Sequence, residues 1–181
     1  AKNWTNDGFL SENKKDIEIL FILKEPNESC ALEPDESGVI KVEAFDNNKP
    51  FWIKDNVNSG KNLHRRMRQA AIELIGKETT EENWMQKSAV INLNKRGGYK
   101  FCDPKQLLNY IKIYKQFILK QIEIINPKTI VFMCGNSDEN RKVIKELNID
   151  AYKIFYCYHP SYRRINDDCY IKKLKEQLYV K

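Results

Sequence analysis

The sequence has no apolar run close to the ~18 residues that a membrane-spanning helix needs, so no membrane partner is expected. Its first eight residues are polar and contain no apolar signal segment. The five cysteines are widely spaced and form no CxxC pair, so neither a disulfide framework nor a zinc or iron–sulfur site is expected. These absences predict a cytoplasmic protein without a metal or other cofactor.

Glycine is also missing where a nucleotide-binding protein needs it. The segment 24–27 follows the first apolar run and contains none, whereas a loop that cradles phosphate at this place is rich in glycine. This argues against a nucleotide-binding α/β protein unrelated to DNA. The net charge is +6, from 31 basic and 25 acidic residues, which permits a polyanionic partner without requiring one.

Four short apolar runs are the main folding signal. They cover residues 17–23, 89–93, 129–134 and 151–157, and each is rich in β-branched or aromatic residues, as buried parallel strands are. Helical patterns separate and follow them at 62–75, 104–125, 139–147 and 167–179. This alternation predicts one α/β domain over residues 1–181, a three-layer α/β/α fold with a short, mainly parallel, four-stranded sheet. Two shorter runs favour a hairpin insertion at 37–54.

Polar residues directly after the predicted strands are the candidates for chemistry, because ligands bind beyond the carboxyl ends of such strands. Glu25, fixed by Pro26, either orients water and stabilises a cation or caps a turn. His159, one of two histidines, either stabilises an oxyanion or is an exposed loop histidine. Asn92, in the second apolar run, either hydrogen-bonds the edge of a base or bonds the backbone.

Aromatic and basic residues accompany these positions. Phe51 and Trp52 offer faces for stacking a base, and a place in the core is the alternative. Basic clusters occur at 64–68, 95–96 and 163–164, either as phosphate contacts or as solvated faces. The last two clusters lie in predicted loops at the functional end of the sheet and fit phosphate better. This joint placement predicts a site that acts on a nucleic acid.

Several segments resemble, in the right order, the motifs of the uracil-DNA glycosylase superfamily. They are Leu23–Asn27, Lys49–Phe51 with Ser59–Leu63, Val90–Arg96, Ile125–Gly135 and Tyr158–Arg164. The resemblance covers roughly residues 17–177 and is closest to the branch that normally carries an iron–sulfur cluster. Cysteines hold the cluster in that branch, whereas this chain has Asn94–Gly97 at the place of one ligand and no N-terminal pair. No cluster is therefore expected.

The resemblance implies a uracil-DNA glycosylase-like fold and a monofunctional, monomeric DNA glycosylase of base-excision repair. Such an enzyme flips a nucleotide out of the DNA and hydrolyses the N-glycosidic bond of uracil or a modified pyrimidine. Glu25 and His159 would be catalytic, and Pro26, Asn27, Phe51 and Asn92 would hold the base. DNA would be contacted by Lys95, Arg96, Ser161, Tyr162, Arg163 and Arg164.

Two alternatives remain within this resemblance. One is a catalytically inactive DNA-binding module of the same fold. The other is an enzyme that acts on a modified pyrimidine instead of uracil, because Lys24, Asn27 and an insertion at 30–49 leave room for an altered pocket.

Overall fold

A mostly parallel sheet runs through the middle of the computed structural model, which describes residues 8–11, 16–24, 62–94, 104–135, 137–160, 162 and 164–178. Within these residues its strands are β1 (Gly8–Phe9), β2 (Ile19–Leu23), β3 (Ser88–Asn92), β4 (Thr129–Phe132) and β5 (Lys153–Tyr156). Their order is β1-β3-β2-β4-β5; β1 is antiparallel to β3, and the other pairs are parallel. The helices are α2 (Asn62–Ile75), α3 (Pro104–Ile125), α4 (Asp138–Leu147) and α5 (Asp167–Glu176), with a 3-10 turn, η1 (Trp84–Lys87).

The sheet has one strand more than the sequence predicts. The expectation of four strands is wrong because β1, only 2 residues long, pairs with the outer edge of β3. A strand of this length has no period that a hydrophobic pattern could reveal. The four parallel strands lie within two residues of their predicted bounds, and α2 and α3 match theirs. Helix α5 ends at Glu176, before the expected end at residue 179, and the hairpin predicted at 37–54 lies outside the described residues.

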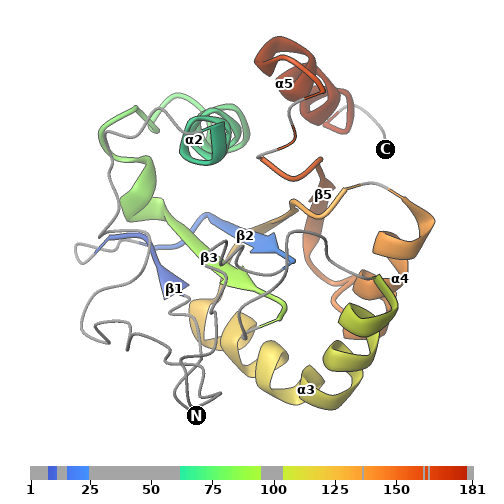
Figure 1. The fold of residues 1–181 in the computed structure, drawn as a ribbon. Helices are drawn as coiled ribbons and strands as arrows, with labels where there is room; N and C mark the ends of the chain where they lie inside the picture. The colour runs from blue at the N-terminus through green and yellow to red at the C-terminus, as the bar shows by residue number, and fades with distance from the viewer. Residues whose placement is uncertain are drawn as a thin grey trace, which may run out of the picture.

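Helices cover both faces of the sheet, which gives three layers (Figure 1). Alternate residues of β2 point to opposite faces, as in any strand. Leu20 and Ile22 join the apolar core under α3 and α4. Ile19 and Phe21 join a second core under α2 and α5. All five residues of β2 are buried, which explains why this strand appears in the sequence as an unbroken apolar run.

Local sequence explains where the helices begin and end. Pro104 occupies the first position of α3, where its missing N–H costs nothing. Asn126, at φ 48, ends this helix in the left-handed conformation, which asparagine tolerates better than most residues. Helix α5 begins after Asn166, whose side chain accepts a hydrogen bond from the backbone N–H of Cys169 at 2.9 Å. No helix among the described residues is both long and apolar enough to cross a membrane.

The topology marks one end of the sheet as the place for a ligand. Among the described elements, the helix that follows β2 in sequence is α2, on one face, whereas the helix that follows its neighbour β4 is α4, on the opposite face. In doubly wound sheets ligands bind where the chain leaves neighbouring strands in opposite directions, at their carboxyl ends. The segment that leaves β2 at this point begins with Lys24.

Candidate functional site

Four of the residues predicted for the site fall within the described part of the chain. They are Asn92, His159, Tyr162 and Arg164. The other predicted residues lie outside it: Glu25, Pro26, Asn27, Phe51, Lys95, Arg96, Ser161 and Arg163. The described four belong to two places at the carboxyl end of the sheet, because Asn92 ends β3 and the other three follow β5.

Asn92 is buried at the point where two strands end together. Only 3% of the residue is exposed, and it lies opposite Leu23, the last residue of β2. The pairing continues one step further, where the backbone N–H of Asn94 donates to the carbonyl of Lys24 at 2.8 Å. A carboxamide carries an acceptor and donors together, so a buried one at a strand end can hydrogen-bond the edge of a base.

The ends of β4 and β5 are also tied to each other. The N–H of Cys157 donates to the carbonyl of Phe132 at 2.9 Å, and the N–H of Gly135 donates to the carbonyl of Cys157 at 2.8 Å. Gly135 has a φ of +95, and a Cβ there would lie 3.0 Å from the side-chain nitrogen of Asn140. Glycine therefore suits this turn, which holds the exit of β4 against the exit of β5.

His159 is half-buried, so it is not the exposed loop histidine that the sequence left as an alternative. Burial, together with the positive charge of Lys24, lowers the pKa of its imidazole from 6.5 to about 4. The ring is therefore neutral at pH 7, with one nitrogen carrying a proton that it can donate in a hydrogen bond. The influence of Lys24 also means that the segment leaving β2 and the loop after β5 lie near each other.

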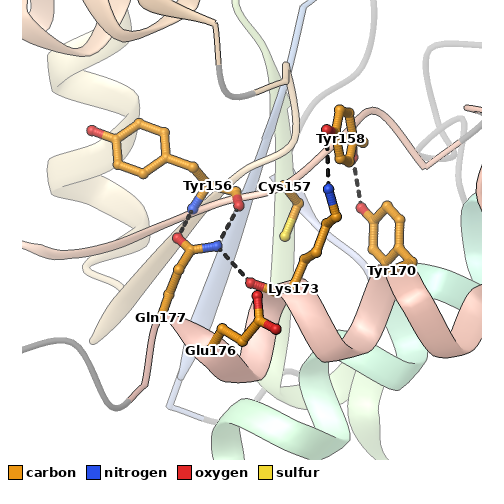
Figure 2. A pocket seen from close by; sticks show the side chains of 7 residues that line it. All are labelled: Tyr156, Cys157, Tyr158, Tyr170, Lys173, Glu176 and Gln177. Carbon is orange, nitrogen blue, oxygen red and sulfur yellow. Dashed lines mark hydrogen bonds between the residues drawn. The ribbon is translucent and has the colours of Figure 1, made fainter.

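The loop that carries His159 is packed against α5 (Figure 2). The ring of Tyr158 stacks on that of Tyr162, with centroids 5.1 Å apart and planes inclined by 10°. The Lys173 ammonium lies 4.9 Å from the centroid of the Tyr158 ring and 3.3 Å from its hydroxyl. The hydroxyl of Tyr170 donates to the backbone carbonyl of Tyr158 at 2.7 Å. These contacts fix Tyr158, the residue directly before His159.

A cavity of about 250 Å³ lies next to this loop, between β5 and α5. It is lined by Tyr156, Cys157, Tyr158, Tyr170, Lys173, Glu176 and Gln177 (Figure 2). Gln177 caps the edge of β5, because its side chain accepts from the N–H of Tyr156 at 2.8 Å and donates to the carbonyl at 2.7 Å. Burial raises the pKa of the Cys157 thiol to about 12, so this thiol is a packing group and not a nucleophile.

Arg66 holds the same loop from α2, a role that the sequence analysis did not identify. Its side chain is 2% exposed. Its Nε donates to Oδ1 of Asp167 at 2.9 Å, and one terminal nitrogen donates to the carbonyls of Pro160 at 3.0 Å and Tyr162 at 2.6 Å. The other terminal nitrogen donates to the carbonyl of Ile165 at 2.6 Å. The loop after β5 is thus anchored to two helices.

The sequence offered two interpretations of the basic cluster in α2, phosphate contact or a solvated face, and both are wrong for Arg66. Arg65 and Arg68 are partly exposed and pair with Asp167 at 2.6 Å and Glu81 at 3.1 Å. One signal could have identified Arg66. It lies four residues before Ala70, on the buried face of α2. A basic residue on an apolar helix face indicates a partner inside the fold.

The described residues contain no group of three or more histidine, cysteine, aspartate or glutamate side chains that could hold a metal ion. The described cysteines are free thiols, and Cys134 and Cys157 are buried, as their apolar surroundings in the sequence predict. Comparison with protein-family models gives no match, and comparison with the curated proteins gives none either. The function has to be inferred from the site itself.

Proposed function

We propose that this protein is a DNA glycosylase that hydrolyses the N-glycosidic bond of uracil or a modified pyrimidine in DNA. The observation that carries the proposal is the neutral, half-buried imidazole of His159 at the same end of the sheet as the buried carboxamide of Asn92. One group can hydrogen-bond a base edge, and the other can stabilise negative charge on a base oxygen. The order of motifs along the chain supports the same assignment.

The two groups come from strands that are not neighbours in the sheet. β2 and β4 separate β3 from β5, so the strand that carries Asn92 and the strand before His159 lie about 14 Å apart, or three inter-strand spacings. Lys24 leaves the sheet between them, at the end of β2, and its charge acts on His159. Glu25 is the next residue in the sequence, and the proposal assigns it the role of the acid in this site.

The reaction breaks the bond between the sugar C1′ and the base nitrogen, and the electron pair leaves with the base. Negative charge then accumulates on a carbonyl oxygen of the pyrimidine, and positive charge develops on the sugar. Because its conjugate acid has a pKa of about 4, His159 is neutral at pH 7 and stabilises the oxygen through an N–H hydrogen bond. Water adds to C1′, and its released proton is taken up by solvent or by the departing base. Glu25 would position that water and stabilise the sugar cation.

Charged and aromatic groups after β5 support DNA as the partner. Arg164 is exposed, as a phosphate contact requires. Tyr162 is 36% exposed and, because it is backed by the ring of Tyr158, presents a rigid aromatic surface. The chain also carries a net charge of +6, which permits a polyanionic partner.

The test is base release by the full chain from single- and double-stranded oligonucleotides that contain uracil or modified pyrimidines, with the free base detected by mass. We expect release of one such base. His159→Ala should slow it by about 10²–10³-fold because a preorganised donor is lost, and Glu25→Gln should slow it comparably. His64→Gln, the matched control at the other histidine, should retain full activity.

Two results would contradict the proposal. If the wild-type chain binds these DNAs but releases no base from any of them, it is the inactive DNA-binding module of the same fold. If His159→Ala melts normally and retains full activity, the imidazole has no part in the reaction.

A further inference from the structure

The peptide carbonyls on both sides of His159 are held by buried side chains. The carbonyl before it, on Tyr158, accepts a hydrogen bond from the Tyr170 hydroxyl at 2.7 Å. The carbonyl after it, on Pro160, accepts one from Arg66 at 3.0 Å. Tyr170 and Arg66 are each 2% exposed. The backbone at His159 is therefore held on both sides, which sets the direction in which its Cα–Cβ bond leaves the loop.

Arg66 uses most of its hydrogen-bonding capacity on this loop. Of the five N–H donors that a guanidinium carries, four are directed at acceptors between Pro160 and Asp167. Three of the four acceptors are backbone carbonyls, which an arginine fork can hold at fixed separations. A lysine at this position has one charged nitrogen and could not reproduce that spacing.

The two anchors also contact each other. The guanidinium carbon of Arg66 lies 4.7 Å from the centroid of the Tyr170 ring, within the range of a cation–π interaction. This contact joins α2 and α5, two helices that are far apart along the chain and lie on the same side of the sheet (Figure 1). A change in either side chain should affect the other.

Burying a guanidinium costs desolvation free energy, which a wholly apolar cluster in place of Arg66 and its partners would avoid. Removing Arg66 alone is costly, because its partners stay buried without it. What the arginine adds is a fixed geometry for several carbonyls of one loop. The loop is the one that carries His159 and Tyr162.

We propose that Arg66 is a positioning residue, which together with Tyr170 holds the loop after β5 so that the His159 imidazole and the Tyr162 ring meet the substrate in one fixed arrangement. Arg66 acts through the loop and does not touch the base. The predicted change in kcat rests on the proposed glycosylase function. The predicted change in the titration of His159 does not, and it can be measured without any substrate.

The test compares Arg66→Lys with Arg68→Lys in the full chain. Both variants keep the positive charge on α2, but Arg68 is partly exposed and pairs with Glu81 instead of the loop. Proton NMR of the imidazoles follows each histidine through a pH titration, and the His64→Gln variant assigns the two signals. In Arg66→Lys we expect the His159 pKa to rise from about 4 towards 6.5 as the ring loses burial, while Arg68→Lys leaves it unchanged.

A second variant separates positioning from folding. Tyr170→Phe removes only the hydroxyl that holds Tyr158 and should shift the His159 signal in the same direction as Arg66→Lys, by less. If either variant melts at a lower temperature while the His159 titration and chemical shift stay at the wild-type values, the anchor is merely structural and the proposal is overturned. If Arg66→Lys does not fold, the His159 titration and chemical shift in Tyr170→Phe test the proposal instead.

The kinetic test is separate. On a substrate that the wild type cleaves, Arg66→Lys should lower kcat by about 10–10²-fold, because a small misplacement of a reacting group is costly. A shifted His159 signal without any wild-type base release would refute the proposed function and leave the positioning role intact. A shifted signal with unchanged kcat would refute the positioning role for catalysis.

Discussion

The two helical layers stabilise this protein in different ways. On one face of the sheet, α3 and α4 pack through apolar side chains such as Leu107, Ile111 and Ile118. On the other face, α2 and α5 also contribute apolar side chains, but they carry Arg66 and Tyr170 as well, whose polar atoms bond the loop after β5. Among the described residues, each helix side chain that donates a hydrogen bond to that loop or to the start of α5 belongs to α2 or α5.

This difference suggests a division of roles. Apolar packing is non-directional, so the layer of α3 and α4 contributes stability without fixing any one loop closely. Hydrogen bonds are directional, so the layer of α2 and α5 can set where a loop lies. Damage to the two layers should therefore have similar effects on stability and different effects at the site.

The largest expected losses of stability come from one substitution in each layer. Ile118→Ala removes a fully buried side chain from α3 and should lower the free energy of unfolding by about 4 kcal/mol through the cavity it leaves. Arg66→Met should lower it by about as much, because the carboxylate and carbonyls that faced the guanidinium lose their partner. Urea unfolding at pH 7 measures both.

Hydrogen exchange then separates the two variants. The N–H of Tyr162 donates to the carbonyl of His159 at 2.9 Å, so its exchange reports whether the loop opens. In Ile118→Ala the Tyr162 N–H should lose only as much protection from exchange as the drop in the free energy of global unfolding accounts for. In Arg66→Met its protection should fall further, because the loop opens locally. Equal losses in the two variants would show that the layers are not distinct in this respect.

The same contrast explains what the sequence could predict. The apolar side chains of α3 recur at helical spacing, so both the helix and its buried face follow from the pattern alone. The contacts of Arg66 with the loop and with the first residue of α5 span 94 to 101 residues, and most of the acceptors are backbone carbonyls, which every residue has. No residue type in the loop marks it as the partner of an arginine.

The candidate site was predictable only in part. The rule that ligands bind at the carboxyl ends of parallel strands singled out Asn92 and His159, and the structure puts both at that end of the sheet. The charge state of His159 was not predictable, because it depends on burial and on Lys24, which is 135 positions earlier in the chain. The catalytic roles of Glu25 and His159 stay predictions.

A smaller effect is expected from pH, and it tests how firmly the α2 and α5 layer holds His159. Since the folded pKa is about 4 against an ordinary 6.5, the unfolded chain takes up the proton first as the pH falls. The free energy of unfolding should therefore drop by about 2 kcal/mol between pH 7 and pH 5 on account of this residue, and the loss is complete only below pH 4.

His159→Gln isolates that contribution, because carboxyl groups titrate in the same range in every variant. Urea unfolding at pH 7 and pH 5 should show a smaller loss for His159→Gln than for the wild type, and His64→Gln should keep most of the wild-type loss. If His159→Gln loses as much unfolding free energy between pH 7 and pH 5 as the wild type does, the His159 ring is not held away from solvent. That result would weaken the contrast between the layers.

The smallest effects come from the two capping residues that begin α4 and α5. Ser137 accepts from the N–H of Asn140 at 3.3 Å, and Asn166 accepts from the N–H of Cys169 at 2.9 Å. Ser137→Ala and Asn166→Ala should each lower the free energy of unfolding by about 1 kcal/mol, because a helix N–H loses its acceptor. Asn166, however, lies between Ile165 and Asp167, which both bond Arg66. Only Asn166→Ala should therefore move the His159 imidazole signal, and an equal shift in Ser137→Ala would place control of the loop in both layers.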